Sequence, residues 1–221
     1  MRNWGLVCLL VAGMMAGTAA AQEKPDAVFR VDFTNAGLVP AHWTMEFHPD
    51  GTGHFRSERG NAARSDQDPI EPPDVDRDIR LSATFASHVF QVAERKQLFA
   101  GGCESRLRVA FQGLKKLRYE GPAGKGGCEF NYSKDAEIQN LGDALVSVAS
   151  TVIEGARLQA LLQHDRLGLD KEMEILVEAA ADGRARQICS IQEILEELTQ
   201  DPTVLERVKR RARALLAKAN N

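Results

Sequence analysis

Apolar and polar side chains alternate one by one over residues 28–58. The apolar members are Phe29, Val31, Phe33, Trp43, Met45, Phe47 and Phe55. A period of two predicts short strands that bury one face and leave the other in water. Pro49-Asp50-Gly51 lies between two of these strands and predicts a hairpin turn, because proline fixes φ and glycine accepts a positive φ.

Folding about this turn places Met45 opposite Phe55, and Glu46 opposite His54. The polar face of the hairpin would then hold Glu46 with His42, His48 and His54. Imidazole and carboxylate groups are zinc ligands, but this spacing matches no zinc motif and the face is exposed. We therefore expect solvated side chains here, with no metal site and no cofactor.

Residues 59–78 contain almost nothing to bury, which predicts a long, exposed and mobile loop. It is either a plain connection or a protruding recognition loop. A helix is expected from Ser82, a good N-cap, to Phe99. Its apolar face would carry Phe85, Val89, Val92 and Phe99.

Three more strands are expected over 106–111, 117–119 and 128–132, from the same alternation. Cys103 and Cys128 each follow a Gly-Gly pair, and we predict a disulfide between them. In a plain meander, the middle strand would separate the other two by roughly 9–10 Å, too far for a disulfide. Either Cys103 lies in the loop before its strand, or the strand order is not sequential.

From Ser133 onward the apolar period changes to that of helices. A long helix capped by Ser133, with a bend at Gly155, is followed by shorter helices. Asp170 is expected to begin the second helix and Gly183 to end it. Asp201-Pro202 is expected to begin the last helix. About five helices joined by short turns would stack as antiparallel neighbours.

The first 21 residues have the order of a secretory signal peptide. Arg2 precedes an apolar run, and small residues end at Ala19-Ala20-Ala21. The mature chain would begin at Gln22 and be exported, either to the periplasm or outside the cell, where disulfides persist. The apolar run is too short to span a membrane, and no second long run is found, so we expect no membrane-spanning segment.

The formal net charge of the chain is −3 at pH 7, which does not favour a nucleic-acid partner. The motifs G-x-S-x-G, H-E-x-x-H, C-x-x-C and G-x-G-x-x-G do not occur in the sequence. Gly124-Lys125 lies in a loop predicted over 121–127 and lacks the spacing and the hydroxyl of a phosphate loop. The sequence thus favours a binding protein over an enzyme and indicates no catalytic residue.

Charge is segregated on the last two helices. The basic residues of the final helix include five candidates for binding a partner: Arg207, Lys209, Arg210, Arg211 and Arg213. They either pair with the acidic helix before Pro202 or form a basic face for an acidic protein or an anionic membrane. Cys189 is the remaining cysteine. It either links two chains into a homodimer or lies in a second buried face.

The segment Met45–Gly53, the helix after it and the strand pair ending Leu117-Arg118-Tyr119 resemble a recurring exported bacterial domain. The resemblance covers roughly residues 27–135, and some similar domains are protease inhibitors. It implies a hairpin, a helix and a strand pair, and it identifies no site residue. The segment from Asp201 to Leu205 with its helix resembles HEAT-type repeats, although residues 140–218 show no clean period.

We therefore predict an α+β protein with three parts: a signal peptide at 1–21, a mainly antiparallel sheet with one packed helix at 22–133, and an all-helical bundle at 134–221. The predicted function is non-catalytic binding to another protein of the cell envelope, with inhibition of an exported protease as a narrower form. The alternative is an envelope hydrolase whose site is assembled in space.

Overall fold

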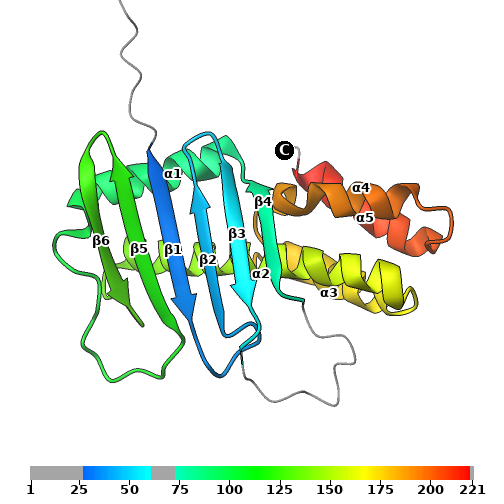
Figure 1. Ribbon diagram of the computed structural model, residues 1–221, viewed down its shortest axis with the longest axis horizontal. Helices are drawn as coiled ribbons and strands as arrows, with labels where there is room; N and C mark the ends of the chain where they lie inside the picture. Colours follow the sequence, from blue (N-terminus) through cyan, green and yellow to red (C-terminus); the bar gives the residue numbers. More distant parts are fainter. Residues whose placement is uncertain (1–26, 61–72, 220–221) are drawn as a thin grey trace, which may run out of the picture.

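The structure is a computed structural model that describes residues 27–60 and 73–219. The predicted signal peptide and residues 61–72 of the predicted loop lie outside the described residues. The chain has an α+β fold, as predicted, with one six-stranded antiparallel sheet in the order β4-β3-β2-β1-β5-β6 (Figure 1). The strands are β1 (Val28–Thr34), β2 (His42–Phe47), β3 (Thr52–Glu58), β4 (Val75–Arg80), β5 (Leu114–Gly121) and β6 (Gly124–Phe130).

The predicted hairpin is confirmed in its register. β2 and β3 pair with Met45 opposite Phe55 and Glu46 opposite His54. The turn between them closes with the Gly51 N–H donating to the carbonyl of His48 at 3.0 Å, and Gly51 has a φ of 87°. The apolar side chains of β1 and β2 are buried on one face, which fixes the opposite face as the polar one.

Two helices cover the buried face of the sheet: α1 (Ala83–Arg95) and the first half of α2 (Ala136–His164). Figure 1 shows both behind the strands. Ser82 caps α1 as expected, because its Oγ accepts the Phe85 N–H at 3.2 Å. The sequence pattern predicts one packed helix here and places the helix after Ser133 in the C-terminal bundle; the first half of α2 is the second helix on this face.

The helix α2 belongs to two hydrophobic cores at once. Its residues up to Ala156 pack with the sheet, and those from Leu158 pack with α3 (Gly168–Ala181), α4 (Gln192–Gln200) and α5 (Glu206–Ala219). By length and composition α2 could cross a membrane, but its apolar residues fill these two cores. The bundle lies beside β4, where Arg77 pairs with Glu193 of α4 at 3.1 Å (Figure 1).

The predicted disulfide links Cys103 and Cys128, with a Cα–Cα distance of 5.8 Å. Cys103 lies in the coil after α1, and Cys128 lies on the helix-covered face of β6, opposite Leu117 of β5. The conflict between the disulfide and a plain meander does not arise, because Cys103 lies in coil and no strand forms between it and β5.

The strand expected over 106–111 is not formed. Residues 102–113 have no regular secondary structure, and Leu107, Val109 and Phe111 are exposed. Both edges of β5 are occupied by β1 and β6, and residues 110–112 bond instead to the side chain of Asn131, just beyond the end of β6. An alternating pattern is therefore not sufficient for a strand.

Other boundaries also differ from expectation. Residues 75–78 of the predicted loop belong to β4, because Val75 and Ile79 bury their side chains. Asp135, rather than Ser133, caps α2, which continues through Gly155 without a break. Asp201 forms a turn by accepting the Thr203 N–H at 2.7 Å, and α5 begins only at Glu206.

Candidate functional site

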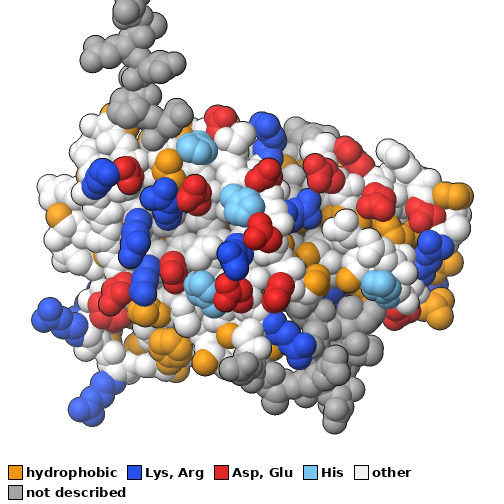
Figure 2. Space-filling model, viewed as in Figure 1, with side chains coloured by type: hydrophobic (Ala, Val, Ile, Leu, Met, Phe, Trp, Pro, Cys, Tyr) orange, Lys and Arg blue, Asp and Glu red, His pale blue; other side chains and the backbone are white. Residues whose placement is uncertain are grey.

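No described helix covers the second face of the sheet, which therefore presents the outward side chains of all six strands. Alternation from the buried positions assigns to this face a set of charged residues: Arg30, Asp32, Glu46, His54, Arg56, Glu58, Asp76, Asp78, Arg80, Lys116, Arg118, Glu120, Lys125 and Glu129. Figure 2 shows this face, with Lys and Arg gathered on the β1, β5 and β6 side. We call it the open sheet face.

The basic part of the open sheet face is built around Arg30 and Arg118, which lie opposite each other on β1 and β5. Arg30 is paired: its Nε donates to Glu46 at 2.6 Å, and an Nη lies 3.8 Å from Glu120. Across the described ranges, no ion pair is found for Arg118 or for Lys116 beside it. These two cations are free to bind an external anionic group.

A shallow groove of about 520 Å³ runs along this basic part. Its floor includes Gly127 of β6, which lies opposite Arg118 and has no side chain to fill the space. Lys125 borders the groove but forms an ion pair with Glu120. Lys116 and Arg118 supply the unpaired positive charge of the groove, which Glu129, opposite Lys116, partly offsets.

The acidic part of the face holds His54 of β3 between two aspartates of β4. Nδ1 of His54 lies 2.9 Å from Asp78 Oδ1, and Nε2 lies 2.9 Å from Asp76 Oδ1. The hydrogen bond with Asp78, and then that with Asp76, raises the pKa of His54. Both ring nitrogens can donate only in the imidazolium form, so His54 acts as a cation that joins β3 to β4 and has no free nitrogen for general-base catalysis.

The other two histidines of the hairpin have partners different from those of His54, although His48 and His54 line one groove. His42 lies 3.6 Å from Asp32, and Nδ1 of His48 is 3.1 Å from the carbonyl oxygen of Ala27. Within residues 27–60 and 73–219, no group of three or more His, Cys, Asp or Glu side chains is arranged to hold a metal ion.

A second groove, of about 750 Å³, lies at the end of the sheet between the Pro49-Asp50 turn and α1. Among its lining residues, His48 bonds to a backbone carbonyl, and the Ser87 Oγ donates to the Pro49 carbonyl at 3.4 Å. The Tyr119 hydroxyl donates to Glu94 at 2.9 Å, and burial, followed by this bond, raises the pKa of Tyr119. No hydrogen bond between histidine and serine is found in the described part of this groove.

The basic residues predicted as a partner site on α5 are mostly engaged within the chain. Arg207 and Arg211 contact Asp170 of α3 at 2.7 and 2.6 Å. Lys209 is buried and lies 3.4 Å from Glu206, which is also 3.9 Å from Arg213. Of the five, only Arg210 has no ion pair in the described structure. These contacts hold α5 against α3, and binding of a partner by this helix stays a prediction.

Cys189 lies half-buried in a short 3-10 helix (Ile188–Ile191) before α4. Its Sγ is 3.6 Å from Gln187 Oε1, and burial raises the pKa of the thiol, which disfavours the reactive thiolate. A link between two chains through Cys189 stays a prediction.

Lys116 and Arg118 were not among the residues predicted as a candidate site. A signal was present, because the two alternate with the apolar Leu117 and Tyr119, which are buried. Comparison with protein-family models and with curated proteins finds no match for this chain.

Proposed function

We propose that the protein is a non-catalytic binding protein of the cell envelope that recognises another protein through its open sheet face. The observation that carries this proposal is that two cations without an ion pair in the described residues, Lys116 and Arg118, line a groove on a sheet face that no described helix covers. A rigid sheet holds these groups in place before a partner arrives, which lowers the entropic cost of binding.

The unpaired cations on this face support an acidic region in a protein partner. Lys116 and Arg118 lie on β5, whereas Asp76 and Asp78 on β4 are already bonded to His54. An acidic region of the partner would meet the two cations, since complementary charges fix register and speed association. The cell-envelope location is supported by the signal-like start of the chain and by the Cys103–Cys128 disulfide.

Inhibition of an exported protease is the narrower form of this proposal. It would use the same face or the segment 61–72, which lies outside the described residues. The alternative, an envelope hydrolase, would use the groove that contains His48, Ser87 and Tyr119. We favour binding because the polar groups of that groove already have partners within the chain.

The test is affinity capture from the envelope fraction, followed by measurement of binding to the purified partner. Three forms are compared: the unaltered protein, a Lys116→Glu/Arg118→Glu variant, and an Arg210→Glu/Lys218→Glu variant on α5 as a matched change of charge. We expect a specific partner whose affinity falls at least tenfold in the sheet variant alone and declines with salt.

Equal affinity for all three forms would refute the open sheet face as the binding surface. Loss of binding only in the α5 variant would move the surface to that helix. Absence of any partner, together with turnover of a substrate that depends on His48 or Ser87, would replace the proposal with the hydrolase alternative.

A further inference from the structure

The coil that joins the disulfide to β5 exposes an unusual set of side chains. In residues 104–112, Phe111, Leu107 and Val109 are 62%, 50% and 39% exposed. Leu107 and Phe111 are among the most exposed large apolar residues of the described chain. Arg106 and Arg108 alternate with these residues and are exposed as well. We call this segment the apolar–basic loop.

The apolar–basic loop is fixed at both ends. At its start, Cys103 is bonded to Cys128, and the Ser105 N–H donates to the Tyr132 carbonyl at 2.8 Å. At its end, the Gln112 N–H donates to Asn131 Oδ1 at 2.7 Å. The exposure of its apolar side chains is therefore set by the fold, and the loop is organised to meet a partner.

The two arginines carry unneutralised positive charge. No ion pair of Arg106 or Arg108 is found in the described residues. The nearest carboxylate in sequence, Glu104, is occupied: it accepts the backbone N–H groups of Asn131 at 2.8 Å and of Arg106 at 3.3 Å. These bonds lower the pKa of Glu104, that of Asn131 contributing most, so it stays ionised in this backbone role.

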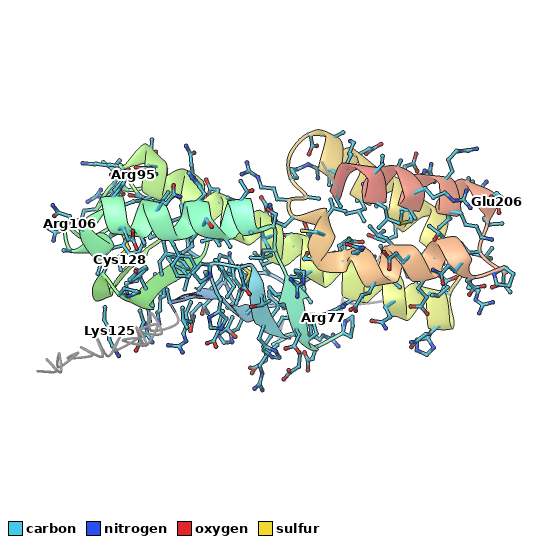
Figure 3. The ribbon with its side chains drawn as sticks, turned by 90° about the horizontal axis from the view of Figure 1, so that it is seen from above. Arg77, Arg95, Arg106, Lys125, Cys128 and Glu206 are labelled. Carbon is cyan, nitrogen blue, oxygen red and sulfur yellow. A yellow bond between two sulfur atoms is a disulfide. The ribbon has the colours of Figure 1, made fainter. Side chains whose placement is uncertain are left out.

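The loop also lies at one extreme of the molecule. Arg106 is at one end of the long axis, and Glu206 is at the other (Figure 3). Arg95 and Lys125 lie at the same end as Arg106. A projection of this kind can touch a flat surface without a clash from the rest of the chain.

The size of the apolar set decides between two kinds of partner. Three side chains fall far short of the roughly 800 Å² per partner that a stable protein interface buries. They are sufficient for shallow insertion into a bilayer, where apolar burial and contact of arginine with lipid phosphates add. When the apolar side chains enter the bilayer, the guanidinium groups beside them would lie at the level of the lipid phosphates, which guanidinium groups bind well.

We propose that the apolar–basic loop docks the protein end-on to an anionic lipid bilayer. Phe111, Leu107 and Val109 enter the boundary of the acyl chains, and Arg106 and Arg108 bind headgroup phosphates. This surface is distinct from the groove at Lys116 and Arg118, so the two proposals can fail independently.

The test is co-sedimentation of the disulfide-intact protein, as isolated from cells, with lipid vesicles. Its N-terminus is sequenced first, because a retained leader would bind lipid by itself. Vesicles of phosphatidylcholine alone are compared with vesicles of equal parts phosphatidylglycerol and phosphatidylcholine. We expect binding to the anionic vesicles only, weakened by salt.

Two loop variants separate the two contributions. Leu107→Ser/Phe111→Ser should weaken binding by tenfold or more, and Arg106→Gln/Arg108→Gln should weaken it by roughly tenfold and reduce its salt dependence. The matched control is Leu167→Ser/Arg210→Gln, which alters exposed residues of the helical bundle. Circular dichroism confirms that each variant is folded.

A Phe111→Trp variant reports insertion directly, because Trp43 is buried and gives a constant background. Its emission should shift to shorter wavelength on anionic vesicles. No binding to anionic vesicles, or equal binding by the loop variants and the control, would overturn the proposal. The proposal would also be overturned if the loop variants weakened binding to a purified acidic protein but had no effect on binding to vesicles.

Discussion

Replacing Cys103 and Cys128 together by alanine should destabilise the sheet core by about 3.5 kcal/mol. The two cysteines are 25 residues apart in sequence, and closing a loop of that length in the unfolded chain accounts for this figure in the chain-entropy treatment. Alanine avoids placing a new hydroxyl at the 5% exposed position of Cys103. Cys189→Ala is the matched control, since it removes a cysteine that closes no loop.

Urea unfolding followed by two probes measures the effect. Tryptophan fluorescence reports the sheet core, because Trp43 is the only tryptophan in the described chain and is 3% exposed there. Far-ultraviolet circular dichroism reports mainly the helices of both cores. We expect the fluorescence midpoint to fall by roughly 1–2 M, given typical slopes for urea.

The two cores make the prediction more specific. The disulfide belongs to the core formed by the sheet, α1 and the first half of α2, whereas α3–α5 surround the second core. If the cores unfold separately, only the transition seen by Trp43 should shift. A loss below 1 kcal/mol, or an equal loss in Cys189→Ala, would refute the reasoning.

Three further predictions concern single residues. Gly155→Ala should destabilise the protein by about 1–2 kcal/mol, although alanine has the better helix propensity, because the added Cβ would lie 3.0 Å from Ile191 Cβ. Thermal unfolding checks this, with Ser150→Ala as the control variant. The pKa of His54 is raised in the folded protein, so its stabilising effect should be full below about pH 6.5 and should disappear as the pH rises through the raised pKa. The unaltered protein and His54→Gln should therefore converge in stability at alkaline pH, and a constant difference between them would contradict the prediction. Burial lowers the pKa of Lys115, so between that pKa and about 10.4 the unfolded chain holds this proton more tightly, and the contribution of Lys115 to stability rises with pH; over this range in alkaline unfolding experiments, the stability of the unaltered protein should rise relative to that of Lys115→Met.

Local patterns predicted the parts of the fold that depend on near neighbours. The β2–β3 hairpin needed only the alternation of Met45 and Phe47 with polar residues and the turn at Gly51. The disulfide was predicted from two Gly-Gly-Cys segments in a chain whose first residues resemble an export signal. The α1 cap was predicted because Ser82 bonds to a group three residues away.

Contacts between distant segments escaped the same reasoning. The segment 106–111 alternates as clearly as β1, yet it forms no strand, and the end of this segment bonds to the side chain of Asn131 after β6. Of the two interpretations of the basic residues of α5, pairing with the acidic helix α4 is not the contact formed by Arg207 and Arg211, which contact Asp170 of α3 instead, since α3 and α5 pack together. Lys116 and Arg118 became a candidate site only when the open face of the sheet was known.

The amino-acid sequence by itself determined which side of the β2–β3 hairpin is apolar, where its turn at Gly51 falls, and that Ser82 caps α1. Those features depend on a residue and a few neighbours, whose spacing is written directly in the chain. Only the tertiary structure decided which face of the sheet stays open, which alternating segment joins it, and which charges remain unpaired. Each of these outcomes depends on competition among segments far apart in sequence for the same edge, face or counter-ion, and local spacing does not encode the result of that competition.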